Sequence, residues 1–83
     1  MFVIYVNGTC FGVATTFETA LKGFKTAYIA EYEDVLGAEA VGYFAIISCY
    51  TLKRKYKESE NEIYDIYMAD NEDCWIEKVP LIK

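Results

Sequence analysis

The chain has 83 residues, of which 54% are hydrophobic and 17% aromatic, and its formal net charge is −5. So apolar a composition excludes an intrinsically disordered chain, and this length holds one core, so we expect residues 1–83 to form a single domain. Charged residues interrupt every apolar run before the roughly 20 residues that a membrane span requires. The N-terminus has neither the basic region nor the cleavage site of a signal peptide, so we expect a cytoplasmic protein.

The first predicted element is a β-hairpin over residues 2–13. Asn7 and Gly8 lie between two apolar runs, and both tolerate the positive φ of a type I′ turn. A turn of this length pairs Val6 with Thr9, Ile4 with Phe11 and Phe2 with Val13. These six side chains share one face, which is expected to pack on a helix. Gly12 is expected to mark either a bulge or the close approach of another segment.

A helix is predicted from Thr16 to Asp34 or Leu36. Thr15 and Glu18 have the T-x-x-E spacing of a capping box, and apolar residues then recur every three or four positions. Gly37 follows at the position where helices commonly end.

The next segment, residues 41–52, is apolar at alternate positions on both faces, which favours a central strand. The rest of the chain divides into a polar hairpin tip, a strand, a turn and a last strand, at 53–62, 63–68, 69–73 and 74–79. The sequence therefore predicts an α+β domain in the order ββαβββ. It would have an antiparallel sheet of about five strands, with one main helix packed on a face.

The residue types argue against catalysis and against metal binding. The chain has no histidine, so it lacks the usual general base near neutral pH and the usual partner of a Ser or Cys nucleophile. No glycine-rich phosphate loop is present. The cysteines, Cys10, Cys49 and Cys74, lie in predicted strands, where we expect reduced, buried thiols that lack a fourth zinc ligand. We therefore predict no enzyme, no cofactor and no metal.

Half of the positive charge lies in one short run, at Lys53, Arg54, Lys55 and Lys57. On a hairpin tip these cations could contact phosphates while Tyr56 stacks on a base, as in proteins that bind single-stranded RNA. The alternative is a solvated loop whose lysines pair with the glutamates that follow.

Acidic residues gather at the end of the predicted helix, at Glu31, Glu33, Asp34 and Glu39. Acid at this end opposes the helix dipole, which favours cations there. One hypothesis is that these carboxylates imitate nucleic-acid phosphates and face the basic groove of a partner protein. The alternative is that they only keep a small apolar domain in solution.

The opening of the chain has the spacing Val6-Asn7-Gly8-x-x-x-Gly12-Val13-x-x-Thr16-x-x-x-Ala20. This pattern covers about the first quarter of the chain and resembles the hairpin-plus-helix start of small accessory proteins of tailed bacteriophages. The resemblance implies a compact host-takeover or anti-defence protein that inhibits a host nuclease, CRISPR complex, restriction enzyme or toxin. It transfers no site residues.

The sequence thus predicts a non-enzymatic inhibitor that occludes a host factor acting on nucleic acid. Its first contact would be the acidic residues and its second contact the basic run. The first alternative is a small RNA-binding protein that acts through residues 53–57. The second is a structural homodimer, because one helix cannot cover a sheet that is apolar on both faces.

Overall fold

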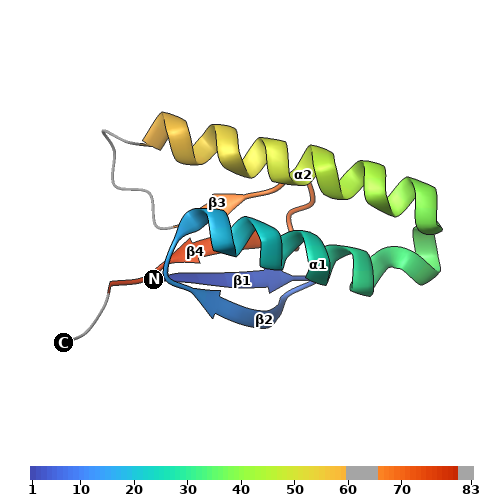
Figure 1. Cartoon of the computed structure of the whole chain (residues 1–83), viewed down its shortest axis with the longest axis horizontal. Helices are drawn as coiled ribbons and strands as arrows, with labels where there is room; N and C mark the ends of the chain where they lie inside the picture. The colour runs from blue at the N-terminus through green and yellow to red at the C-terminus, as the bar shows by residue number, and fades with distance from the viewer. Residues whose placement is uncertain (60–65, 81–83) are drawn as a thin grey trace.

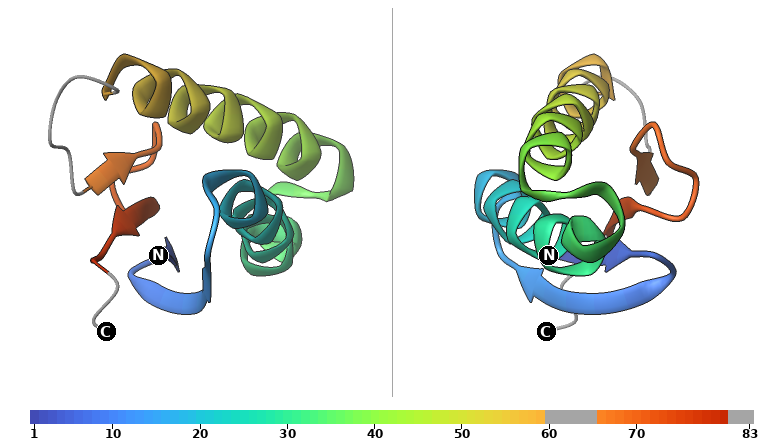
Figure 2. Two further views of the ribbon diagram at one scale, coloured as in Figure 1. Left: turned by 60° about the vertical axis from the view of Figure 1, so that its left-hand side comes forward. Right: turned by 90° about the vertical axis from the view of Figure 1, so that its right-hand side faces the viewer.

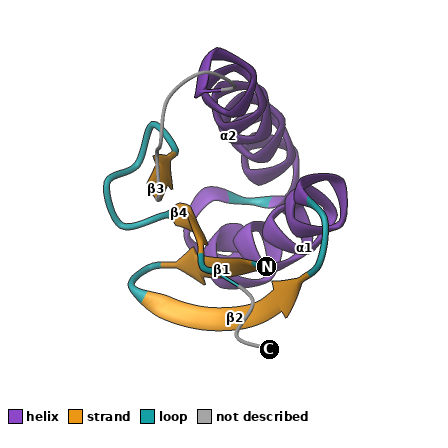
Figure 3. Cartoon of the chain, turned by 90° about the vertical axis from the view of Figure 1, so that its left-hand side faces the viewer, coloured by secondary structure: helices purple, strands orange, loops and turns teal. Residues whose placement is uncertain are grey.

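Two helices lie on one face of a four-stranded antiparallel sheet with the strand order β2-β1-β4-β3 (Figure 1). This computed structural model describes residues 1–59 and 66–80. Its elements in chain order are β1 (Phe2–Val6), β2 (Thr9–Ala14), α1 (Phe17–Leu36), α2 (Ala38–Glu58), β3 (Ile66–Met68) and β4 (Trp75–Lys78). Helix α1 packs on β1 and β2, and α2 lies against α1 and beside β3 (Figures 2 and 3).

The prediction of a strand at residues 41–52 is wrong, because this segment belongs to α2. Its buried positions recur at helical spacing and face the rest of the protein: Val41, Ala45, Ser48, Thr51 and Leu52. The described chain therefore has two helices and four strands in the order ββααββ, in place of one helix and five strands in the order ββαβββ. Within the described ranges, no helix combines the length and the apolar composition of a membrane span.

The predicted turn of the first hairpin is confirmed. Asn7 and Gly8 have φ values of 53° and 74°, as a type I′ turn requires, and Val6 faces Thr9. Gly8 also donates its N–H to the carbonyl of Asp73, which joins this turn to the turn between β3 and β4.

Beyond that turn the register shifts by one residue, so the other two predicted pairs are wrong. Ile4 faces Gly12 instead of Phe11, and Phe2 faces Ala14 instead of Val13. Gly12, with φ 155°, lies at the expected bulge. Because of the shift, Phe11 and Val13 do not pack in the core as expected, and their side chains are 43% and 59% exposed.

Helix α1 begins and ends close to the predicted positions. Its N-cap is Thr16, one residue later than the predicted capping box, and the Thr16 hydroxyl accepts a hydrogen bond from the N–H of Thr19 at 3.2 Å. Gly37, with φ 85°, ends α1 and donates its N–H to the Glu33 carbonyl at 2.8 Å. The same glycine is the N-cap of α2, so the two helices form a tight hairpin.

Four aromatic rings join the helices to the sheet. Phe17 of α1 stacks on Tyr56 of α2, with ring centroids 4.0 Å apart and planes 9° apart. Phe2 of β1 meets the Phe17 ring edge-on at 5.5 Å, and Tyr67 of β3 meets it at the same distance. The core of the described chain thus has an aromatic centre to which β1, β3 and both helices contribute.

Strands β1 and β4 lie side by side at the centre of the sheet. Their pairing continues past β4, where the backbone N–H of Val79 donates to the Met1 carbonyl at 2.9 Å and the Met1 amino group donates to the Val79 carbonyl at 3.1 Å.

The two glycines inside the helices are expected to respond differently to an added methyl group. Gly42→Ala should raise the free energy of unfolding by about 0.5–1 kcal/mol, because Gly is disfavoured in a helix interior and its new Cβ meets no atom within 4 Å. Gly23→Ala should gain less, because its Cβ would lie 2.7 Å from Ile4 Cδ1. Urea denaturation followed by circular dichroism measures both changes. A destabilised Gly42→Ala protein would contradict the helix at that position.

Candidate functional site

The turn between α1 and α2 projects beyond the end of the sheet (Figure 1). The predicted acidic site lies on this projection, and its members are exposed: Glu31, Glu33, Asp34 and Glu39. We call residues 31–39 the acidic tip. Glu31 accepts a hydrogen bond from the Asn7 amide at 3.1 Å, which ties the tip to the β1–β2 turn. The carboxylates therefore share one end of the molecule, as proposed from the sequence, although they are distributed around two helices.

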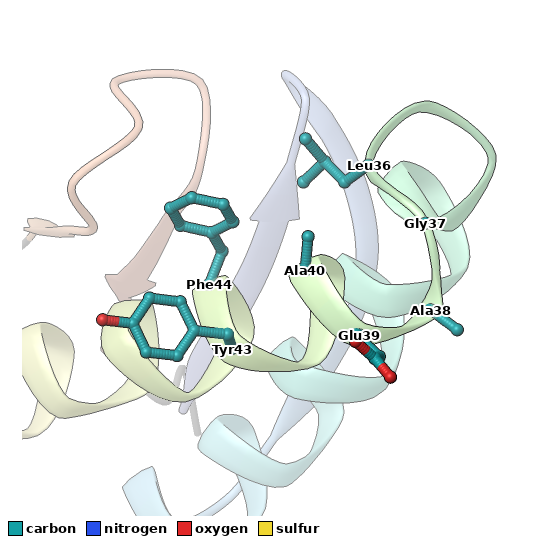
Figure 4. Close-up of a pocket in the computed structure, with 7 residues that line it drawn as sticks. All are labelled: Leu36, Gly37, Ala38, Glu39, Ala40, Tyr43 and Phe44. Atoms are coloured by element: carbon teal, nitrogen blue, oxygen red, sulfur yellow. The ribbon is translucent and has the colours of Figure 1, made fainter.

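Exposed apolar side chains accompany these carboxylates. Val35 is 80% exposed, Leu36 37% and Phe44 44%. An open groove of about 640 Å³ lies at the turn, lined by Leu36, Gly37, Ala38, Glu39, Ala40, Tyr43 and Phe44. The side chains of Leu36, Ala40 and Phe44 gather on the same side of the first turns of α2 (Figure 4). The acidic tip therefore offers apolar contact area as well as negative charge.

The basic run 53–57 is divided between two sides of α2. Lys53, Arg54 and Lys57 are exposed and line a shallow depression together with Tyr50. Lys55 instead donates a hydrogen bond to the Met68 carbonyl at 2.8 Å. In the described chain Arg54 also approaches Glu58 at 4.0 Å, one helical turn away.

The prediction that Tyr56 lies on a hairpin tip is wrong, because Tyr56 lies in α2 and stacks on Phe17 in the aromatic centre. Its ring is therefore not available to a nucleotide base. Tyr50, 67% exposed, is the aromatic residue that lies among the cations. Sequence reasoning missed Tyr50 because it placed this residue in a strand; a helical projection of residues 38–58 places it beside Lys53, Arg54 and Lys57.

The cysteines differ from one another in exposure. Cys10 is exposed, so the expectation that it is buried is wrong, whereas Cys74 is buried and Cys49 is half-buried in α2. Burial raises the pKa of the Cys49 thiol, which therefore stays protonated near neutral pH. Across residues 1–59 and 66–80, no three His, Cys, Asp or Glu side chains come close enough to hold a metal ion.

Comparison of this chain with protein-family models, with curated proteins and with solved structures finds no match. Its surfaces are therefore interpreted from their own chemistry.

Replacing Tyr56 and replacing Tyr50, the two tyrosines of α2 nearest the basic run, should have different effects on the free energy of unfolding. Tyr56→Ala removes the ring that stacks on Phe17 and should lower the free energy of unfolding by about 2–4 kcal/mol. Tyr50→Ala, at an exposed position, should change it by no more than about 0.5 kcal/mol. Denaturant titration measures both values. Equal losses would contradict the assignment of Tyr56 to the core.

Burial of Tyr28 and Tyr32 should make the fold sensitive to alkali. Desolvation raises the pKa of both phenols above the ordinary value of 10.0, so above this pH the unfolded chain ionises more readily than the folded one. Stability should be full below pH 10 and fall as the pH rises through 10 toward the raised values. In urea titrations above pH 10, the free energy of unfolding of Tyr32→Phe should fall less steeply with rising pH than that of the unmodified chain. The exposed Tyr50→Phe control should follow the unmodified chain.

Proposed function

We propose that this chain is a non-enzymatic binding protein of the phage anti-defence type. It would inhibit a host factor that acts on nucleic acid by covering the basic groove of that factor. The observation that carries the proposal is the acidic tip, where exposed Val35 and Leu36 lie among carboxylates on one helical turn.

Each part of the tip has a distinct role in this proposal. Burial of Val35, Leu36 and Phe44 against a partner would supply affinity, because removal of apolar surface from water is the main favourable contribution to association. The carboxylates would speed the encounter and select a basic surface over an acidic one. The tip is also held in place before binding, since Glu31 is bonded to Asn7 and Gly37 to Glu33. Little ordering entropy then opposes association.

The titratable groups support binding over catalysis. In residues 1–59 and 66–80, the groups whose pKa burial raises are Tyr28, Tyr32 and Cys49, and each of these is neutral near pH 7. A general base near neutral pH needs a group whose pKa lies close to that pH. The depression beside Tyr50 and the groove at the tip are open surfaces, and the described residues that line them include no buried ionisable side chain.

RNA binding is the second candidate, supported by the three exposed cations around Tyr50. An exposed ring among Lys53, Arg54 and Lys57 could stack on a base while the cations contact phosphates. This site is smaller than the one expected from the sequence, because Lys55 and Tyr56 are held elsewhere.

Charge reversal at the acidic tip should abolish partner binding. Glu33→Lys/Asp34→Lys places positive charge against a basic groove and therefore opposes binding. The new lysines interact favourably with the dipole at the C-terminal end of α1, so the free energy of unfolding should stay the same or rise. Affinity capture of the tagged chain from nuclease-treated bacterial lysate, with mass spectrometry of the bound proteins, measures the effect. We expect the unmodified chain to retain a protein partner that excess duplex DNA displaces.

A matched control changes the same net charge at other exposed positions. Glu18→Lys/Glu58→Lys alters the first turn of α1 and the last turn of α2, both far along the chain from the tip. This control should retain the same partner. A tip variant that still captures the partner would contradict the proposal, and partners lost on nuclease treatment alone would favour RNA binding.

A further inference from the structure

The side of α2 that faces away from α1 and the sheet has large apolar side chains at its centre. Tyr43, Ile46 and Tyr50 are 63%, 59% and 67% exposed. Charged residues lie on the same side of α2 toward each end of the helix. We call the whole set the outer face of α2, and it consists of Glu39, Tyr43, Ile46, Tyr50, Lys53 and Lys57.

The spacing along this face is that of a coiled-coil seam. Successive members are separated by four, three, four, three and four residues, so they repeat every 3.5 residues. A helix with this repeat presents a straight stripe to a partner helix. Helix α2 has 21 residues, which corresponds to a length of about 30 Å. Its buried stripe of Val41, Ala45, Ser48 and Leu52 is already used within the chain, so the outer face is a second stripe on the same helix.

The charges on the face are separated by sign. Glu39 lies at the N-terminal end of α2, and Lys53 and Lys57 lie toward the C-terminal end. Two copies paired in parallel would place like charges against each other, whereas two antiparallel copies place Glu39 of each beside Lys57 of the other. Complementary charge at seam edges fixes partner choice and orientation in helix pairs.

We propose that a second copy of this chain binds the outer face, with the two α2 helices antiparallel about a two-fold axis at the level of Ser48. In this register Ile46 lies beside Tyr50 of the second copy, and Tyr43 lies beside Lys53 of the second copy. Glu39 and Lys57 close the seam at both ends. The two-fold symmetry makes each contact occur twice, as in any isologous dimer.

The area of the face suits such a dimer. The exposed parts of Tyr43, Ile46 and Tyr50 together amount to about 400 Å², since aromatic side chains can bury roughly 150–250 Å² each. The flanking charged side chains, with their aliphatic stems, bring the contact toward the roughly 800 Å² per partner of a standard interface.

This dimer does not rest on the function proposed above. Glu39 belongs to both the acidic tip and the seam, whereas Glu33, Asp34 and Val35 belong to α1 and lie outside the seam. In the antiparallel dimer the two acidic tips would lie at opposite ends of the paired helices. Loss of the dimer and loss of partner capture are therefore separate results, obtained with different variants.

The first test is the oligomeric state of the chain and of Ile46→Asp. Sedimentation velocity over a range of protein concentrations should show a monomer–dimer equilibrium for the unmodified chain. Ile46→Asp puts a carboxylate at the centre of the seam and should raise the dimer dissociation constant at least ~100-fold. The control Val35→Asp makes the same kind of change at an exposed position outside the seam and should leave the constant unchanged. Circular dichroism checks that each variant is folded.

The second test determines orientation by exchanging charges. Glu39→Lys and Lys57→Glu alone should each raise the dissociation constant ~10-fold, because each creates two like-charge contacts in the antiparallel dimer. The double variant Glu39→Lys/Lys57→Glu should restore it to near the original value. In a parallel dimer each single change would replace one like-charge contact by another and leave the dissociation constant nearly unchanged. Weakening by each single change followed by rescue in the double variant therefore identifies the antiparallel arrangement.

Three results would overturn the proposal. A chain that sediments as a monomer at every concentration has no such dimer. A dimer that Ile46→Asp leaves intact uses another surface. A monomer that binds a labelled single-stranded RNA 20-mer in fluorescence anisotropy, and loses it in Lys53→Ala/Lys57→Ala, assigns the outer face to RNA.

Discussion

The arrangement of both helices depends on the contact between Phe17, the first residue of α1, and Tyr56, near the end of α2. Because α1 and α2 form a hairpin closed by Gly37, this stacked pair fixes the opposite, open end of that hairpin. Phe2 and Tyr67 meet the same rings edge-on and attach the sheet there. This cluster attaches both helices to the sheet at one end of the hairpin. Toward the other end the hydrogen bond between Asn7 and Glu31 ties α1 to the β1–β2 turn, and the α1–α2 turn extends beyond the strands (Figure 1).

The elements that sequence reasoning predicted well are those specified by local chemistry. Asn7 and Gly8 determine a turn through φ, and Thr16 and Gly37 cap a helix through hydrogen bonds, whatever the rest of the chain does. The prediction for residues 41–52 is wrong because the buried side of α2 includes the small residues Ala45 and Ser48 beside Val41 and Leu52, while the large Tyr43, Ile46 and Tyr50 are exposed. Ala45 and Ser48 are buried, so the helical period was hidden behind an apparent alternation. The side chains that hid it form the proposed dimer seam, which is where local rules are expected to fail for functional reasons.

The grouping of the charged residues at the candidate sites could be predicted from the sequence, whereas the exposure of the apolar residues beside them could not. Acidic residues close together in sequence stay together at a helix end, so Glu31, Glu33 and Asp34 could be grouped from the chain alone. To predict how the basic run is divided, by contrast, one must know which side of α2 faces α1 and β3. Only tertiary packing determines this. The same packing determines which aromatic residues are buried, as Tyr56 is, and which are left on the surface, as Tyr50 is.

The adjacency of β1 and β4 has a consequence for how the chain acquires its structure during synthesis. Strand β1 pairs on one side with β2, its neighbour in sequence, but its other neighbour is β4, which lies at the far end of the described chain. Until β4 emerges from the ribosome, one edge of β1 has no partner and Ile76 is missing from the core. The helical hairpin and the first β-hairpin can form early because their contacts are local, whereas the sheet closes only at the final step. Until β4 docks, the nascent chain therefore exposes an unpaired edge of a central strand, which is a template for pairing with other chains.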